Sequence, residues 1–398
     1  MTEALGVAFA FVVIIVLVTR KVHMGSAMLA GASIIALASR YSAARLLNVT
    51  SSAFTSYTTW ELALSVVFIS LIGNCMKKTG RLDSMVNSLR DMVRSNRAAI
   101  MLTPALIGTM PVLGGAALSA PMVDALGDKM SLDPETKSAA NLVFRHACFL
   151  VFPFMPGLIL ASRLWELDLY RLVLMNMPAA LAAIITAYFT LLGGSKNPDS
   201  ERFAPFRDAA RSFVSSAAPI LVALATFGAL STTLPLSLGM GAAVALIQAR
   251  KQVSTRSALG FVDWWTSLSM LAIMIFRGMV QEAQAVGSLI GALIDSGVSK
   301  SLLFFLIPLL LGFITGSVSV TVAVSFPILI PFAKSAPATY AMLAYSASFI
   351  SYMTSPIHLC QLLTCQYFGV RPWKVFLKYL PSLLALVAAV VIVAAVTL

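Results

Sequence analysis

The chain has 398 residues, of which 59% are hydrophobic and only 11% charged, and its mean hydropathy is +0.89. These values are typical of a polytopic membrane protein and not of a soluble globular enzyme. The net charge of +12 does not indicate nucleic-acid binding, because the basic residues lie in short loops between apolar runs and no basic groove with interleaved aromatic residues is present.

The first part of the chain predicts three membrane spans and a surface helix. Leu5–Thr19 and Met24–Ser39 read as two spans, and the absence of a basic leader argues against a signal peptide. A polar segment, Arg40–Thr59, precedes the third span, Trp60–Met76. Gly80–Arg97 places apolar residues at helical spacing opposite a charged face, which predicts an amphipathic helix at the membrane surface.

The next stretch is too short and too interrupted to cross a bilayer. The ten residues from Ala99 to Gly108 reach about 15 Å, half of a ~30 Å hydrocarbon layer. Residues 99–125 therefore predict a re-entrant hairpin, followed by a helix over 137–165 that Pro153 and Pro156 interrupt. Irregular backbone at membrane depth persists only where protein or a water-filled cavity satisfies its amides. These breaks are therefore expected to line a site.

The second half repeats this order after a further span, Asp168–Leu192. Residues 1–195 form the first repeat, 196–211 a polar cytoplasmic linker and 212–398 the second repeat. The expected elements of the second repeat are spans at Ser212–Leu230 and Ser231–Ala249, a span opened by Asp263, a surface helix at Met279–Ser296, a hairpin at 302–332, a broken helix at 337–368 and a last span at Val375–Leu398. Each half has five spans plus a hairpin. Because five is an odd number of crossings, the second copy has the opposite orientation in the membrane, which predicts an inverted repeat in an all-α membrane protein.

The basic residues also predict the orientation. With the N-terminus outside, most Lys and Arg fall on cytoplasmic loops, as the positive-inside rule requires. Both termini are then outside the inner cell membrane. The first hairpin enters from the cytoplasm and the second from the outside.

Polar residues gather at the breaks, where half-helix N-termini attract anions and unwound carbonyls suit Na+. Single Ser and Thr residues in membrane helices usually bond to their own backbone, so the concentration at two related breaks carries the argument. The candidate substrate- or ion-binding residues are Thr109, Pro111, Gly114, Gly115, His146, Pro153, Pro156, Thr315, Gly316, Ser317, Ser319, Ser351, Thr354, Ser355 and His358. No metal site is predicted beyond a Na+ site at the hairpin tips.

Three ionisable residues lie inside apolar runs. Arg145 either belongs to the site or extends to the cytoplasmic interface near Lys137, whereas His146 is a functional candidate. His358 either binds substrate or a coupling proton, or is a structural imidazole satisfied by a hydroxyl.

The acidic residues are informative because none falls near a break. Proton coupling through a buried carboxylate is therefore disfavoured, while Na+ coupling or proton coupling through His remains open. The available Arg, His and helix N-termini favour an anionic substrate. The four cysteines are expected to be inert buried thiols. No nucleotide-binding or hydrolytic motif appears, so neither ATP-driven transport nor an enzyme is expected.

Two stretches carry a family resemblance, GTMPVLGGAALSAPMVDALG and ETKSAANLVFRHACFLVFPFMPG. They resemble a family of prokaryotic integral membrane proteins of about this length without an assigned function. The order of surface helix, hairpin, broken helix and closing span resembles the ion-transporter superfamily, which includes divalent-anion/sodium symporters, gluconate permeases and TRAP transporter membrane subunits. The Ser-Asn-Thr tip motif of the sodium/dicarboxylate relatives is absent.

The resemblance implies a homodimer in which a mobile domain carrying both hairpins moves against a scaffold in an elevator motion. It places the hairpin tips at Thr109–Gly115 and Thr315–Ser319, and the unwound segments at Pro153–Pro156 and Thr354–Pro356. The predicted function is secondary transport of a small organic anion, of the carboxylate or sugar-acid type, coupled to Na+ or H+. The alternative is a cation/proton antiporter or an ion channel on the same scaffold. The expected partners are the substrate and the lipid bilayer, and no nucleic acid is expected. No cofactor is expected other than Na+ as coupling ion.

Overall fold

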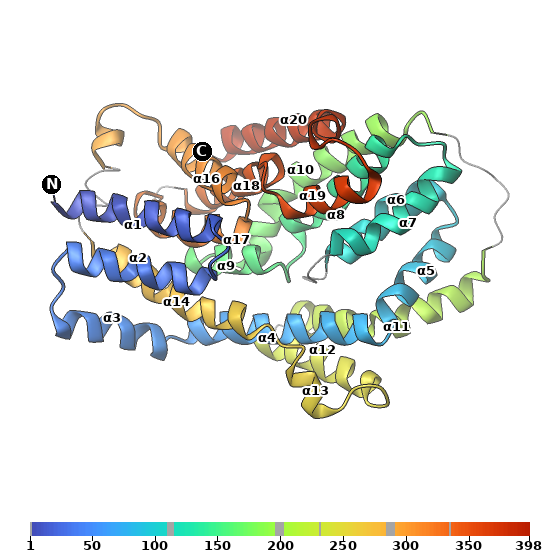
Figure 1. Cartoon of the computed structure of the whole chain (residues 1–398), viewed down its shortest axis with the longest axis horizontal. Coiled ribbons are helices and arrows are strands. Elements are labelled where there is room, and N and C mark those ends of the chain that lie inside the picture. The colour runs from blue at the N-terminus through green and yellow to red at the C-terminus, as the bar shows by residue number, and fades with distance from the viewer. Residues whose placement is uncertain (1, 110–114, 196–202, 231, 284–290, 334–335) are drawn as a thin grey trace.

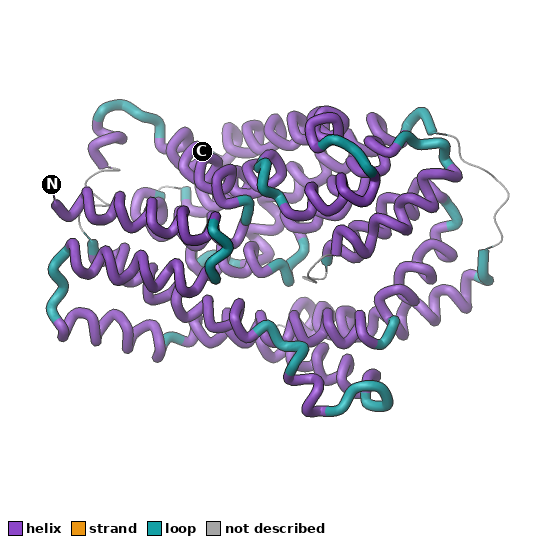
Figure 2. The backbone as a smooth tube through the Cα atoms, viewed as in Figure 1, coloured by secondary structure: helices purple, strands orange, loops and turns teal. Residues whose placement is uncertain are grey.

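The computed structural model describes residues 2–109, 115–195, 203–230, 232–283, 291–333 and 336–398. Within these ranges every regular element is a helix and no strand occurs (Figure 2). The chain is therefore an all-helical protein, as predicted.

The first half places helices close to the predicted ranges. They are α1 (Thr2–Thr19), α2 (Met24–Ala38), α3 (Ala43–Thr55), α4 (Tyr57–Lys78), α5 (Arg81–Val93), α6 (Asn96–Gly108), α7 (Gly115–Lys129), α8 (Pro134–Val151), α9 (Pro156–Leu164) and α10 (Leu169–Ala187), which a π-helix extends over Tyr188–Leu192. The polar segment at 40–59 contains the helix α3. Val49 and Ala53 of α3 are buried, and α3 packs against α14.

The second half contains α11 (Phe206–Ala229), α12 (Leu234–Ala249), α13 (Thr255–Leu259), α14 (Trp264–Glu282), α16 (Lys300–Thr315), α17 (Val318–Leu329), α18 (Pro337–Thr354), α19 (Leu359–Phe368) and α20 (Pro372–Thr397). Helix α11 begins at Phe206, so the end of the expected linker is helical. The surface helix predicted from Met279 is wrong in its first turn, because Met279–Glu282 continues α14 and Met279 is buried. Residues 284–290 lie outside the described ranges.

The helices form two groups by their contacts. We call α6–α10 with α16–α20 the hairpin group and α1–α5 with α11–α14 the frame group. In Figure 1 α10, α16, α18 and α20 lie in the upper part and α3, α4, α11 and α12 in the lower part, while α1 lies at the height of the hairpin group. Within the frame group α2 packs on α14 and α4 on α12, while α10 and α20 pack together in the hairpin group. The groups meet where α5 contacts α6, α1 contacts α16, α14 contacts α17 and α4 contacts α9.

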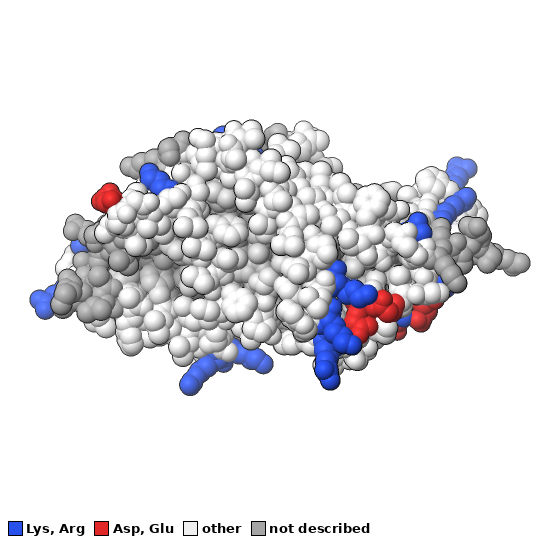
Figure 3. Space-filling model, turned by 90° about the horizontal axis from the view of Figure 1, so that it is seen from above, with Lys and Arg blue, Asp and Glu red and all other residues white. Residues whose placement is uncertain are grey.

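Length and composition make five segments able to cross a membrane. They are Tyr57–Lys78, Pro134–Leu164, Leu169–Leu192, Phe206–Ala229 and Pro372–Thr397. The face seen from above has a broad uncharged middle, with Lys, Arg, Asp and Glu towards its ends and one edge (Figure 3). An uncharged face of this kind suits a hydrocarbon environment, which supports a membrane-embedded protein.

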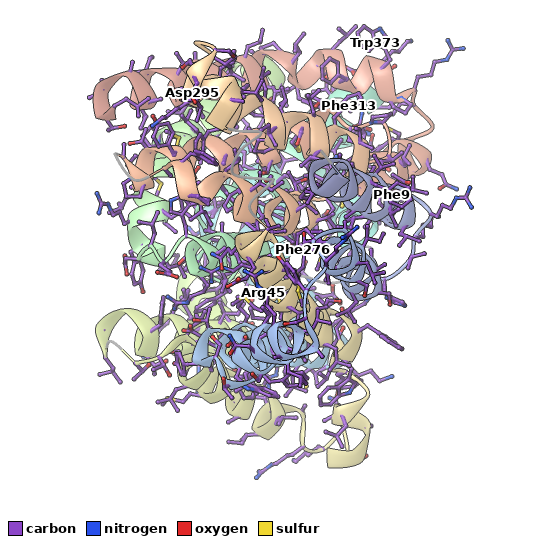
Figure 4. The ribbon with its side chains drawn as sticks, turned by 90° about the vertical axis from the view of Figure 1, so that its left-hand side faces the viewer. Phe9, Arg45, Phe276, Asp295, Phe313 and Trp373 are labelled. Atoms are coloured by element: carbon purple, nitrogen blue, oxygen red, sulfur yellow. The ribbon has the colours of Figure 1, made fainter. Side chains whose placement is uncertain are left out.

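Aromatic residues divide between the interior and the periphery. Phe276 of α14 is fully buried and makes an edge-on contact with Phe11 of α1, their ring centroids 5.9 Å apart. Figure 4 shows Phe276 between helices in the middle of the molecule and Trp373 at its outer edge. Trp373 is 64% exposed and opens α20, a position typical of an interfacial anchor.

Candidate functional site

Two helices are interrupted where the sequence predicted, and prolines explain both interruptions. α8 ends at Val151 and α9 begins at Pro156, with Phe152 and Met155 in extended conformations. α18 ends at Thr354, and Ser355 is extended before Pro356. A proline disfavours the helical conformation of the residue before it, and its ring removes one backbone donor. Each pair of half-helices therefore exposes two helix ends inside the protein.

The second hairpin turns at Gly316 and contacts the second break. Gly316 has a φ of +60°, a left-handed conformation in which a side chain would be strained. Ser317 caps α17 by accepting a hydrogen bond from the Val320 amide at 3.4 Å. Ser355 Oγ donates to the Phe313 carbonyl oxygen at 2.8 Å, which fixes the second break against α16.

The first break lies between the two hairpins. A Cβ added at Gly157 would lie 3.2 Å from Val318 and 3.4 Å from Ser319, so α17 closely approaches the start of α9. On the other side, Thr109 lines a small cavity together with Phe152 and Phe154. Both hairpins therefore reach the same interrupted segment. Of the first tip, Pro111 and Gly114 lie outside the described residues, and Gly115 is the first residue of α7.

A buried polar cluster joins α8 to the second break. We call Arg145, His146, Tyr352, His358 and Cys360 the polar cluster. Both histidines are fully buried, and Arg145 is 4% exposed. The ring centroids of His358 and Tyr352 are 3.9 Å apart, and those of His358 and His146 are 4.9 Å apart.

The two histidines of the cluster differ in their hydrogen bonding. His146 Nδ1 lies 2.7 Å from the Leu142 carbonyl oxygen, which can only accept, so Nδ1 carries the proton. His146 Nε2 is then an acceptor and lies 3.3 Å from Tyr352 Oη, whose one hydroxyl proton also has Cys360 Sγ as an acceptor at 3.6 Å. In contrast, neither ring nitrogen of His358 has a hydrogen-bond partner in the part of the chain that the structure describes. The imidazole satisfied by a hydroxyl is thus His146, and the alternative considered for His358 does not hold.

Arg145 is a buried cation that has no counter-ion within the described ranges. Its Nε and Nη1 atoms are buried and unbonded, and no described carboxylate pairs with it. Arg145 does not extend to the surface of the protein, whereas Lys137, two turns earlier on α8, pairs with Asp124 at 2.7 Å and with Asp128. Arg145 lies near enough to His146, Tyr352 and His358 for its charge to act on all three.

The polar cluster offers metal-ligating atoms, but its charge opposes a cation. One ligand atom each from His146, His358 and Cys360 lie within 4.8 Å of one another. A metal ion placed among them would also face the uncompensated charge of Arg145 across a low-dielectric space. The unpaired guanidinium and the free imidazole therefore suit an anion better than a metal ion.

The hydroxyl groups predicted for the site mostly bond locally. Thr354 Oγ1 donates to the Ile350 carbonyl oxygen at 3.0 Å, and Ser351 Oγ to that of Ser348 at 2.9 Å. Thr315 Oγ1 lies 3.3 Å from Thr321 Oγ1. These bonds leave lone pairs on the hydroxyl oxygens but few free donors.

Three residues near the site went unpredicted. Tyr352 and Cys360 belong to the polar cluster, and Asn141 donates to the Ala116 carbonyl oxygen at 3.1 Å and Thr364 Oγ1 at 3.2 Å, its Oδ1 remaining unpaired. The sequence signal that could have found Asn141 is a polar side chain within an apolar helix. It lies on the helix face that also carries Arg145 and Cys148, because residues three and four positions apart share a face.

Comparison with known proteins places the whole chain in one family. The model of the family described as "Protein of unknown function (DUF401)" matches residues 3–398. No curated protein matches the chain.

Proposed function

We propose, from the premise that the chain belongs to the DUF401 family, that it is a secondary transporter of a small organic anion. Transport uses an elevator motion of the hairpin group against the frame group and draws on a Na+ or H+ gradient. The relation to the ion-transporter superfamily and the homodimer that it implies are parts of the same proposal.

The observation that carries the proposal is the unpaired charge of Arg145. Burying an ionised side chain without a partner in a low-dielectric interior lowers the free energy of unfolding by roughly several kcal/mol. Proteins retain such residues inside membranes where a ligand or another charge compensates them during function. Arg145 lies beside the free imidazole of His358 at a broken helix, and two cationic or donor groups of this kind suit a carboxylate.

The contacts between helices support an inverted repeat. In the inverted repeat α6 corresponds to α16, α7 to α17, α8 to α18, α9 to α19 and α10 to α20. Most contacts between two helices recur between their two counterparts. α6 contacts α8, and α16 contacts α18. α7 contacts α19, and α17 contacts α9. α8 contacts α20, and α18 contacts α10.

Two glycines, Gly108 of α6 and Gly312 of α16, make corresponding contacts in the two halves. A Cβ at Gly108 would lie 2.9 Å from Cys148 Sγ, and one at Gly312 would lie 1.9 Å from Ser351 Oγ. Each glycine thus lets the first helix of a hairpin approach the first half of a broken helix closely, as a pseudo-two-fold arrangement requires.

The test is exchange of labelled anions by purified protein in proteoliposomes. The panel contains pyruvate, gluconate, succinate and citrate, each present unlabelled inside at the same concentration as the labelled form outside. Exchange of at least one anion that falls to the protein-free level in Arg145→Gln supports the proposal. A matched control is Arg171→Gln, because Arg171 is exposed in the first turn of α10.

Exchange of none of these anions would overturn the proposed substrate class. Uptake of Na+ or K+ driven by a pH gradient, with no anion exchange, would instead favour a cation/proton antiporter. A current without saturation would favour a channel.

A further inference from the structure

We infer that the transported anion is accompanied by one proton, which is carried on the imidazole of His358. The inference rests on the proposed function and specifies its coupling ion. It starts from the contrast between the two buried histidines: in the described part of the chain His146 has partners at both ring nitrogens, whereas His358 has none at either.

His358 has room to take up a second ring proton, because neither of its ring nitrogens has a hydrogen-bond partner among the described residues. α8 presents Arg145 and His146, α18 presents Tyr352, and α19 itself presents Cys360. The guanidinium of Arg145 offers donors and no acceptor, and both ring nitrogens of His146 already have hydrogen-bond partners. No described carboxylate bonds to any member of the polar cluster.

The other helices that pack against α19 add no charge to this space. Asp124 of α7 interacts with Tyr367 and Lys137 rather than with His358. Tyr379 of α20 bonds to the Met353 carbonyl oxygen at 2.8 Å and to Gln361 Oε1 at 3.4 Å. His358 is therefore the side chain whose protonation responds to an anion.

Electrostatics couples the anion to the proton. Without an anion, a protonated His358 and Arg145 would place two like charges in one buried space, which is unfavourable. An anion bound to Arg145 removes this repulsion and offers an acceptor for the N–H of the imidazolium. By linkage, the anion raises the proton affinity of the site, and the proton raises its anion affinity by the same factor.

The net charge of the site is the same in the empty and in the loaded state, which suits its movement through the membrane. The empty site carries the single positive charge of Arg145. A site loaded with a monoanion and a proton on His358 carries the same net charge. The hairpin group therefore meets an equal electrostatic barrier when empty and when loaded. On the far side the anion leaves, and the ring nitrogen returns its proton to water.

The experiment compares exchange with accumulation for the anion of the panel that exchanges fastest. An inside-alkaline gradient of one pH unit, without Na+ and with the membrane potential held at zero, should drive up to about a tenfold accumulation for one proton per anion. In His358→Gln the accumulation ratio should fall to 1, while exchange is slower yet measurable. His23→Gln is the matched control, because His23 is exposed and stacks on Trp265. It should accumulate like the wild type.

The outcomes separate the inference from the proposed function. Wild-type exchange without pH-driven accumulation, or accumulation only with a Na+ gradient, would overturn proton coupling and leave anion transport standing. Accumulation retained in His358→Gln would also overturn it. Exchange of no anion would overturn both.

A second measurement uses the wild-type protein and does not depend on the variant folding. In 15N-histidine-labelled protein the ring signals of His358 should change from neutral to imidazolium when the exchanging anion is added. His23→Gln and His146→Gln proteins assign the signals. Ring signals of His358 that stay neutral at saturating anion would contradict the inference.

Discussion

Nη2 of Arg163 lies 2.7 Å from Oε1 of Glu61, and this ion pair joins α9 of the hairpin group to α4 of the frame group. A second pair, Arg277 Nη2 to Glu166 Oε1 at 2.9 Å, joins α14 to the residues that follow α9. A pocket of about 480 Å³ is lined by Glu61, Arg163 and Glu166 among others. The end of α9 is thus held against the frame group by charge, beside an open space.

The two partners of the first pair should differ in the cost of their removal. Arg163→Gln leaves Glu61, whose side chain is 6% exposed, as an unpaired buried anion, and should lower the free energy of unfolding by about 3 kcal/mol. Glu61→Gln should cost less, because the Arg163 side chain is 26% exposed and can reach water. Thermal unfolding in detergent measures both. A larger loss in Glu61→Gln would contradict this account of the pair.

Arg145 should lower the free energy of unfolding and yet be required for anion exchange. Arg145→Leu removes a buried charge that has no partner and should raise the free energy of unfolding by about 1 kcal/mol or more while anion exchange is lost. The contrasting variant is Arg163→Leu, which breaks an ion pair and should destabilise the protein. Unfolding curves and exchange assays on both proteins check this. Destabilisation by Arg145→Leu would mean that the charge is compensated in the empty protein.

Gly108 and Gly312 should not tolerate a methyl group. A Cβ at Gly108 would lie 2.3 Å from the Arg145 carbonyl oxygen, a backbone atom that moves only if α6 and α8 separate. Gly108→Ala and Gly312→Ala should each destabilise the protein by about 1–3 kcal/mol, as overpacking does. Gly194→Ala is the control, since no atom lies within 4 Å of its added Cβ. Unfolding midpoints of the two core variants equal to that of Gly194→Ala would refute the close packing.

The hydroxyl of Thr315 should matter for transport more than for folding. Thr315→Val keeps the shape but removes the contact with Thr321 Oγ1 at 3.3 Å next to the turn at Gly316. Anion exchange should fall by about tenfold, as the loss of one hydrogen bond predicts, with membrane insertion unchanged. Thr190→Val, at an exposed position, should exchange anions normally. Equal rates in both variants would remove Thr315 from the site.

Asp133 should make stability depend on acid pH. Burial alone would raise the pKa of Asp133, but hydrogen bonds from Thr136 and Lys378 outweigh it and hold that pKa below the ordinary value of 3.8. A carboxylate with a depressed pKa contributes stability above its unfolded pKa, and the contribution is lost as the pH falls through the folded one. The wild-type advantage over Asp133→Asn should therefore shrink below about pH 4. Unfolding midpoints across pH 3–7 would show this, and a constant difference would contradict it.

Two features of the frame group were not predicted from the sequence. α3 lies within the polar segment 40–59 and buries Val49 and Ala53, a narrow apolar stripe that suffices for packing on α14. A surface helix was predicted to begin at Met279, whereas α14 continues through Glu282. Arg45 of the frame group pairs with Glu282 at 2.7 Å.

The sequence by itself determined the class of protein, the order of its elements and the places where helices break. Those properties depend on composition, on the period of apolar residues and on proline and glycine, all of which act locally. Only the tertiary structure decided which of the two buried histidines is satisfied and that no carboxylate in the described part of the chain pairs with Arg145. Hydrogen-bond partners come from helices far apart in the chain, so Leu142 and Tyr352 engage His146 while His358 keeps both nitrogens free.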